Sequence, residues 1–275
     1  MDDELLLRYS RQILLPEVDI DGQARLAAAR VLVVGLGGLG SPVAMYLAAA
    51  GVGQLLLVDH DRVELSNLQR QIVHATADIG RAKVASARDR LHALNPTVTV
   101  EALTARLHDD AAFDALPGSF DLVIDATDNF ATRFAINRYC LRSETPLVSG
   151  AAIRFEGQVT VFRPGRGDSP CYRCLYREDS GLDTSCATNG VIAPLLGIIG
   201  SVQAMEALKV LLDIGSDLTG RLLLLDALAM EWQSMRLRRN PQCPECGVAH
   251  AVGADRGSAA APRRRKRAGL KSLGP

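Results

Sequence analysis

Residues 31–40, Val-Leu-Val-Val-Gly-Leu-Gly-Gly-Leu-Gly, decide the fold. The first four residues of this stretch predict a buried strand, and the six that follow, Gly35–Gly40, have G-x-G-x-x-G spacing ahead of a helix-like segment, Ser41–Ala50. A second apolar run, Leu55–Val58, ends in an acid, Asp59, about twenty residues beyond the first glycine. This order of strand, turn, helix, strand and acid is typical of a parallel sheet that binds an adenine nucleotide.

The rest of the first 150 residues continues the alternation of apolar runs and amphipathic stretches. Further strands are predicted at Val98–Val100, Leu122–Ile124 and Leu147–Val148, and helices over Ala82–Leu94, Asp109–Leu116 and Thr132–Leu141. We therefore expect an α/β fold with a Rossmann-like, doubly wound, mainly parallel sheet.

The pattern changes from Gln158 onwards. Two apolar runs, Val159–Phe162 and Leu222–Leu225, flank a long helical stretch around Gln203–Leu212. We expect them to extend the sheet with antiparallel strands joined by one crossover helix. Residues 163–190 lack an apolar period and are rich in Gly, Asp, Ser and Cys. A long excursion of this kind within a compact domain is usually functional.

Composition indicates one domain followed by a tail. No linker-like segment divides residues 1–250, and 48% hydrophobic residues suffice for a large core. The formal net charge is zero, but residues 251–275 hold seven basic side chains and one acidic one, so the body carries six more acids than bases. We expect residues 251–275, with the basic run Arg263–Arg267, to form a disordered basic tail.

The sequence predicts neither export nor membrane insertion. The N-terminus is acidic, whereas a signal peptide begins with basic residues. The longest apolar candidate, Val191–Val202, contains Pro194 and is shorter than the roughly twenty residues of a membrane span. A cytoplasmic location is therefore expected. Six cysteines are too few for a disulfide framework, and the close pairing of four of them favours a metal site.

The nucleotide is indicated by the residues after Asp59. A G-x-G-x-x-G turn alone also serves nicotinamide and flavin enzymes, or simply packs a helix on a strand. Asn67, Arg70 and Lys83 add polar and cationic groups, which suit a triphosphate whose terminal part must leave. Because the chain has no G-x-x-x-x-G-K-[ST] motif, the sequence points to ATP held without a P-loop.

A set of ordered motifs resembles the MoeB/ThiF/HesA branch of the bacterial ubiquitin-activating-enzyme superfamily, from about Leu6 to Cys246. The motifs are Arg8-Tyr9-Ser10-Arg11-Gln12, Ser66-Asn67-Leu68-Gln69-Arg70-Gln71, Ala126-Thr127-Asp128-Asn129, Ser149-Gly150-Ala151-Ala152 and two C-x-x-C pairs. The resemblance is greatest to the members that serve molybdenum cofactor synthesis. It implies that the C-terminal glycine of a small ubiquitin-fold sulfur carrier, such as the small subunit of molybdopterin synthase, attacks the α-phosphorus of ATP, giving acyl-AMP and pyrophosphate.

The resemblance implies these nucleotide-binding roles. The backbone would approach the phosphates at four glycines, Gly35, Gly37, Gly38 and Gly40. Asp59 would bind the ribose hydroxyls, and the phosphates would contact Asn67, Arg70 and Lys83. From the residues alone, Asp59 could instead be a capping or surface acid, and Lys83 a surface lysine on an amphipathic helix.

Two further residues complete the expected catalytic set. Asp128, after the strand Leu122–Ile124, resembles the family's magnesium ligand, with Asn129 beside it; either could also cap the next helix. Asp125, three residues earlier and within the strand, is a weaker candidate. Arg11 matches an arginine that relatives insert into the neighbouring subunit's site, which implies a catalytic homodimer; by sequence alone it could equally lie on the surface.

The cysteine pairs predict a second kind of site. Cys171 and Cys174 form one C-x-x-C knuckle and Cys243 and Cys246 the other. Together they can surround a structural zinc ion with four thiolates, which would staple distant parts of the C-terminal half. A redox pair is the competing interpretation.

The remaining cysteines have different expected roles. Cys140 lies in an apolar helical stretch and is expected to be a core residue. Cys186 lies in the 163–190 excursion, where relatives carry a cysteine that forms a covalent intermediate in some members only. Whether Cys186 is a nucleophile stays open, because no lowered thiol pKa can be read from a sequence.

The sequence analysis therefore predicts an ATP- and magnesium-dependent adenylyltransferase with structural zinc. Its partners would be a carrier ending in Gly-Gly, a separate sulfur donor protein and a second copy of the chain; nucleic acid is not expected, because the basic tail has no aromatic residues for stacking. The thiamine-pathway carrier is the first alternative. A nicotinamide-dependent oxidoreductase and a non-catalytic, zinc-stapled binding module are the others.

Overall fold

The computed structural model describes residues 2–177 and 189–247. Eight strands form one sheet in the order β3-β2-β1-β4-β5-β6-β7-β8. The parallel strands are β1 (Arg30–Val34), β2 (Gln54–Val58), β3 (Thr99–Leu103), β4 (Leu122–Asp125) and β5 (Leu147–Ile153). The antiparallel extension consists of β6 (Glu156–Phe162), β7 (Arg221–Asp226) and β8 (Glu231–Arg236). The predicted fold class is confirmed.

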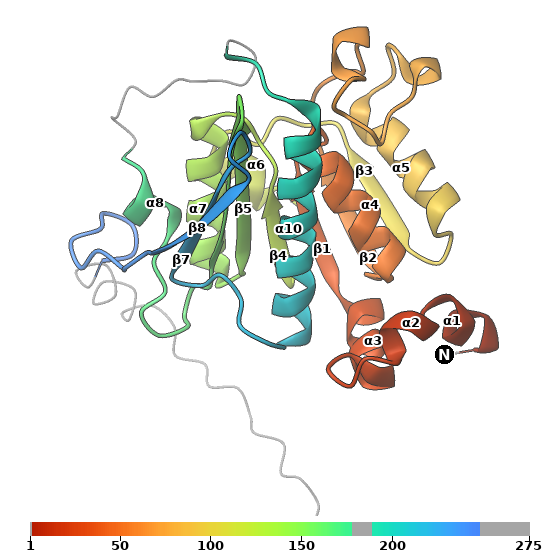
Figure 1. Cartoon of the computed structure of the whole chain (residues 1–275), viewed down its shortest axis with the longest axis horizontal. Coiled ribbons are helices and arrows are strands. Elements are labelled where there is room, and N and C mark those ends of the chain that lie inside the picture. The colour runs from red at the N-terminus through yellow and green to blue at the C-terminus, as the bar shows by residue number, and fades with distance from the viewer. Residues whose placement is uncertain (1, 178–188, 248–275) are drawn as a thin grey trace, which may run out of the picture.

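Helices cover both faces of the sheet (Figure 1). One face packs against α3 (Asp19–Ala28), α4 (Gly40–Ala50), α5 (Lys83–Leu94) and α10 (Ala193–Leu212), and the other against α6 (Asp110–Asp114), α7 (Phe130–Ser143) and α8 (Tyr172–Leu175). Two short 3₁₀ helices, η1 (Leu65–Asn67) and η2 (Thr76–Asp78), lie between β2 and α5.

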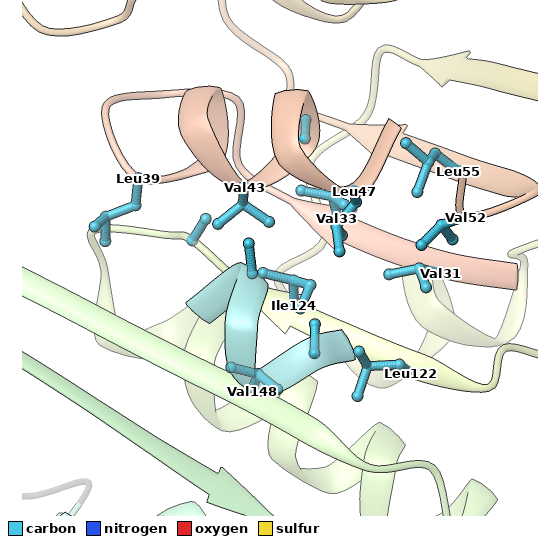
Figure 2. Close-up of a cluster of buried hydrophobic side chains, with 14 of the residues drawn as sticks. Val31, Val33, Leu39, Val43, Leu47, Val52, Leu55, Leu122, Ile124 and Val148 are labelled. Carbon is cyan, nitrogen blue, oxygen red and sulfur yellow. The ribbon is translucent and has the colours of Figure 1, made fainter. Parts of the chain in front are cut away.

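The central strand β1 is apolar along its buried length because both of its faces are covered. Val31 and Val33 belong to the core on the α4 side, and Figure 2 shows them beneath Val43 and Leu47 of that helix. Leu32, between them, faces the opposite core with α7. A parallel strand that is covered on both faces has no polar side, so its sequence does not alternate.

The N-terminal helices lie at the amino edge of the sheet. α1 (Asp3–Arg8), α2 (Ser10–Ile13) and α3 precede β1 and lie below the sheet in Figure 1. Tyr9 accepts a hydrogen bond from Asn95, just ahead of β3, and packs against Gly51, just ahead of β2. Because β2 and β3 start there, this edge is opposite the one where the parallel strands end.

The apolar run Val191–Val202 is predicted to be too short to cross a membrane, and this prediction is wrong because the helix is longer than the run. The helix runs from Ala193 to Leu212, because Pro194 falls in its first turn, where the missing N–H has no helical partner to lose. By length and composition alone α10 could span a bilayer. In the fold it packs against α4, β5 and β6, as the core helix of a globular domain does.

The sequence missed one strand altogether. All six residues of β8 are exposed, so they carry no buried apolar period. Its pairing with β7, from Arg221 opposite Arg236 to Asp226 opposite Glu231, depends on a neighbour that only the assembled sheet provides.

Candidate active site and cysteine cluster

The glycine turn after β1 packs directly on the loop after β4. Gly35 has φ +93°, and a Cβ there would lie 2.7 Å from the carbonyl oxygen of Ala126. A Cβ on Gly40 would lie 1.9 Å from the carbonyl oxygen of Gly35. Only glycine fits these two positions, and the packing brings the N-terminus of α4 to the point between β1 and β4 where the strand order reverses.

A cavity of about 480 Å³ opens at this point. Its lining includes ten of the residues predicted to act at the site or lying next to them in the motifs: Gly35, Gly37, Gly38, Asp59, Arg70, Gln71, Lys83, Thr127, Asp128 and Asn129. The segments that carry them follow β1, β2 and β4 or begin α5. The carboxyl edge of the parallel sheet therefore assembles most of the predicted set around one space.

Asp59 fixes the glycine turn from the end of β2. Its Oδ2 accepts a hydrogen bond from the Leu36 N–H at 2.7 Å, and its Oδ1 accepts from the Asp61 N–H at 2.8 Å. Each carboxylate oxygen has a second lone pair, so the group can still accept from a ligand hydroxyl in the cavity.

Two of the predicted cationic side chains line the cavity. Lys83 begins α5, and its Nζ lies 2.8 Å from Asp61 Oδ2. Burial acts to raise the pKa of Asp61, but the hydrogen bond and charge of Lys83 outweigh it, and the pKa is lowered. Arg70 donates from Nη1 to the Ser66 carbonyl at 2.9 Å, which orients its guanidinium.

Asn67 is not among the cavity-lining residues. Its Oδ1 accepts from the Glu64 N–H at 3.2 Å, and it forms the capping box of η1 with Glu64. In this arrangement Asn67 shapes the loop that leads to Arg70.

Asp128 and Asn129 have separate environments. The Asn129 Oδ1 accepts from the Thr132 N–H at 2.9 Å and so caps α7. Asp128 is exposed, lines the cavity and makes no hydrogen bond or ion pair with the residues that the structure describes. Its carboxylate is available to a cation or a ligand.

Asp125 is engaged within the protein instead. This buried carboxylate accepts from Thr127 through N–H and Oγ1, at 3.0 and 2.7 Å, and from Ser149 Oγ at 2.7 Å. Arg133 lies beside it, 3.7 Å away. These contacts hold the loop that presents Asp128 and agree with the preference for Asp128 as the metal candidate.

Sequence reasoning missed several residues around the cavity. Gln71 is buried, and its Oε1 finds no hydrogen-bond partner among the described residues, so an acceptor is left at the cavity wall. Arg106 donates to His60 Nε2 at 2.8 Å, and both line the cavity. Gln71 could have been found from its place in the Ser66–Gln71 motif. Arg106 and His60 are 46 positions apart and meet only in the fold.

Arg11 is placed elsewhere. It is exposed on α2, at the amino edge of the sheet, and does not line the cavity of its own chain. Cys186 lies outside the described residues. Cys140 is buried in α7, as predicted, and burial raises the pKa of its thiol.

The four paired cysteines converge on one point. Their Sγ atoms lie within 4.8 Å of one another, with separations of 4.0 Å for Cys171–Cys174, 3.7 Å for Cys171–Cys243 and 3.4 Å for Cys174–Cys246. A disulfide would require about 2.05 Å. Tetrahedral zinc with Zn–S bonds of about 2.3 Å places its sulfurs about 3.8 Å apart, so the donor set and the spacing fit that ion.

The surroundings of the cysteine cluster favour a thiolate at Cys174 and raise the pKa of its neighbours Cys171 and Cys246. Hydrogen bonds from Cys171 and Cys246 and from the Asn240 N–H lower the pKa of Cys174. The cluster joins the segment after β6 to the segment after β8, next to Leu141 of α7. The predicted stapling of distant parts of the chain therefore matches the placement of the cysteines.

Comparison with known proteins finds relatives in the family that the sequence motifs resemble. The chain is 50% identical over 247 residues to the molybdopterin-synthase adenylyltransferase of Escherichia coli, covering 90% of this chain and 98% of the relative. It is 49% identical over 249 residues to the SAMP-activating enzyme E1 of Haloferax volcanii, covering 90% and 91%. It is 46% identical over 251 residues to the sulfur carrier protein ThiS adenylyltransferase of E. coli, covering 91% and 99%.

Solved structures support the fold. The structure of E. coli MccB with ATP has a TM-score of 0.76 and 24% identity and covers 87% of this chain and 73% of its own. The profile of the ThiF family matches residues 9–245, which is most of the sequence. The chain therefore belongs to the ThiF family.

Proposed function

We propose that this chain adenylates the C-terminal glycine of a small ubiquitin-fold sulfur carrier protein, using ATP, ahead of thiocarboxylate formation in molybdenum cofactor biosynthesis. A glycine carboxylate oxygen attacks the α-phosphorus, the bond from that phosphorus to the bridging oxygen breaks, and pyrophosphate leaves with the electron pair. The product is an acyl-adenylate. The enzyme is an adenylyltransferase, as its relatives are.

One observation carries this proposal: the glycine turn, the carboxylates of Asp59 and Asp128 and the cations Arg70 and Lys83 line a single cavity. Arg70 and Lys83 would hold the departing pyrophosphate, and Gly35, Gly37 and Gly38 would let the backbone approach the phosphates. Gly40 is not among the lining residues, and its part would be to let the turn close on Gly35. Asp59 would bind the ribose. Asn67 would act indirectly, through the loop that carries Arg70.

Magnesium would be held by Asp128. The carboxylate is a hard oxygen donor, it lines the cavity, and Asn129 rather than Asp128 caps α7. When bound, the ion would neutralise charge on the phosphate oxygens. Asn129 would fix the loop.

Zinc would have a structural role. Cys171, Cys174, Cys243 and Cys246 provide four sulfur donors and leave no coordination position open, which suits folding rather than catalysis. Cysteines that stay reduced to hold a metal also agree with the cytoplasmic location that we propose.

A homodimer is part of the proposal. Arg11 lies at the amino edge of the sheet, whereas the cavity of its own chain lies at the carboxyl edge. We therefore propose that Arg11 enters the cavity of a partner subunit. Exposed apolar residues accompany it on the N-terminal helices, with Leu7 at 77%, Leu14 at 71% and Ile20 at 55% exposure. A self-association surface would cover them.

Residues 1–250 would form the catalytic domain, and 251–275 a basic tail outside the described residues. Cys186, also outside them, would be the candidate for a covalent step with the sulfur donor protein. A Cys186→Ser chain that supports full sulfur transfer would contradict that role. Deleting 251–275 and measuring carrier affinity at low and high salt tests whether the tail attracts the carrier.

The defining experiment is ATP–pyrophosphate exchange with purified carriers that end in Gly-Gly. Exchange that needs both carrier and magnesium, with an acyl-adenylate detected by mass spectrometry, is expected. A chain that binds NADH and shows no exchange would favour the oxidoreductase alternative, and zinc without nucleotide affinity would favour the binding module.

The pathway is decided by the carrier. Similar identities to the molybdopterin and ThiS enzymes, 50% and 46%, leave the thiamine pathway as the alternative. Exchange should be fastest with the molybdopterin-synthase carrier, and a higher kcat/KM with the thiamine-pathway carrier would reverse the assignment.

A further inference from the structure

His74 connects three elements of the cavity without lining it. It is buried at the end of the loop that carries Arg70. Its Nε2 lies 3.1 Å from the carbonyl oxygen of Leu36, in the glycine turn, and its Nδ1 lies 2.8 Å from Ser86 Oγ, in the first turn of α5 after Lys83.

The partners determine the tautomer of His74. The Leu36 carbonyl can only accept, so Nε2 must carry a proton and donate it. Burial, together with the charge of Lys83, lowers the pKa of the imidazole, although the bond to Leu36 and the charges of Asp78 and Asp59 act to raise it. The neutral ring therefore accepts at Nδ1 from the Ser86 hydroxyl.

The two bonds of His74 reach different elements. The bond from Nε2 holds the glycine turn through Leu36, and the bond at Nδ1 holds the first turn of α5 through Ser86.

Leu36 is thus held on both sides. Its N–H donates to Asp59 Oδ2 at 2.7 Å, and its carbonyl accepts from His74. The residues that follow, Gly37 and Gly38, line the cavity. A rotation of the Leu36 peptide would therefore move the backbone that faces the nucleotide phosphates.

We propose that His74 is a positioning residue for ATP. Through its hydrogen bonds to Leu36 and Ser86 it fixes the position of the glycine turn relative to Arg70 and Lys83. The inference rests on the proposed function, because the bound molecule is ATP. His74 touches no substrate. Its effect should appear in ATP affinity and leave the affinity for the carrier unchanged.

Two variants separate the bonds of His74. The amide nitrogen of His74→Gln takes the position of Nε2 and can still donate to Leu36, whereas that of His74→Asn takes the position of Nδ1 and cannot. The control is His92→Asn, which makes the same change at an exposed site on the same helix that contains Ser86.

The measurement is ATP binding by titration calorimetry without carrier, followed by exchange kinetics. We expect the ATP dissociation constant to rise about tenfold in His74→Asn, which removes one buried hydrogen bond, and less than about threefold in His74→Gln. The carrier KM should not change in either variant, and the control should match the unaltered chain.

A merely structural role for His74 predicts a different result. Unfolding of part of the sample would lower the number of active sites in both variants and leave the ATP dissociation constant unchanged. That outcome, or equal ATP affinity in all folded chains, overturns the inference. If His74→Asn does not fold, Ser86→Ala replaces it, and a rise of about threefold in the ATP dissociation constant is expected. An unchanged value overturns the inference.

The proposed function fails separately from this inference. If the unaltered chain binds no ATP, the adenylyltransferase assignment itself is wrong. If it binds ATP and the His74 variants bind equally well, only the role of His74 is wrong.

Discussion

Lys83 and Asp61 form an ion pair, with Nζ 2.8 Å from Oδ2, in which the lysine side chain is 7% exposed and the aspartate side chain 50% exposed. The ammonium group therefore faces the cavity with a carboxylate already beside it. This pairing compensates the burial of the charge, and in the proposed reaction phosphate oxygens of ATP would take the place of Asp61.

Replacing Lys83 should impair the chemical step. Lys83→Ala removes a preorganised charge from the departing pyrophosphate, so kcat for pyrophosphate exchange should fall by about 100-fold. Arg88→Ala is the control, because Arg88 is an exposed cation on the same helix and does not line the cavity. Equal activity of both variants would refute the role of Lys83.

The Lys83–Asp61 pair also predicts a pH dependence of stability. The folded-state pKa of Asp61 is lowered from 3.8, so its charge contributes stability above about pH 4 and loses that contribution as the pH falls through the folded pKa. The free energy of unfolding should exceed that of Asp61→Asn by at most about 1 kcal/mol at pH 7, because half the aspartate is in solvent. Denaturation at pH 7 and pH 3 measures both values. A difference that grows toward acid would contradict the assignment.

Asp128 and Asn129 should respond differently to substitution. Asp128→Asn removes the proposed magnesium ligand but no internal contact, so adenylation should be abolished without loss of thermal stability. Asn129→Ala removes the cap of α7 and should lower the free energy of unfolding by about 1 kcal/mol while retaining adenylation. Exchange assays at several magnesium concentrations and thermal melts of both variants test this. Full exchange by Asp128→Asn would exclude Asp128 as the ligand.

Arg11 can be tested by complementation between subunits. If it acts in the partner's cavity, a mixture of Arg11→Ala and Asp128→Ala chains forms dimers with one intact site. Such a mixture should regain about a quarter of the unaltered activity after subunit exchange. Each variant alone is the control. No recovery, with mixed dimers verified by native mass spectrometry, would mean that Arg11 acts within its own chain or not at all.

The cysteine cluster predicts a metal content. One zinc per chain is expected by elemental analysis, and Cys243→Ser should lose it together with thermal stability, since the proposed metal would join the segments after β6 and β8. Cys140→Ala, at a cysteine 1% exposed in the core, should keep its zinc. Retention of full zinc by Cys243→Ser would show that these four thiols do not form the site.

The sequence by itself determined the parallel half of the fold and the edge at which the site lies. Residues 31–40 and Asp59 were sufficient for this. A strand that is apolar on both faces and is followed by a glycine turn fits few folds other than a parallel α/β sheet, and the ends of parallel strands meet at one edge. The sequence also predicted the cysteine cluster, since the short spacing within each C-x-x-C pair brings two sulfur donors together.

Only the tertiary structure decided how these parts meet. It joined residues 193–212 into one core helix with Pro194 in its first turn, paired the exposed strand β8 with β7, and placed Asn67 in a cap rather than at the cavity. It also brought His74 against Leu36, 38 positions away. Contacts of this range leave no local period in the sequence, because a buried hydrogen bond depends on the distance between atoms in the folded chain, which their separation along the chain does not specify.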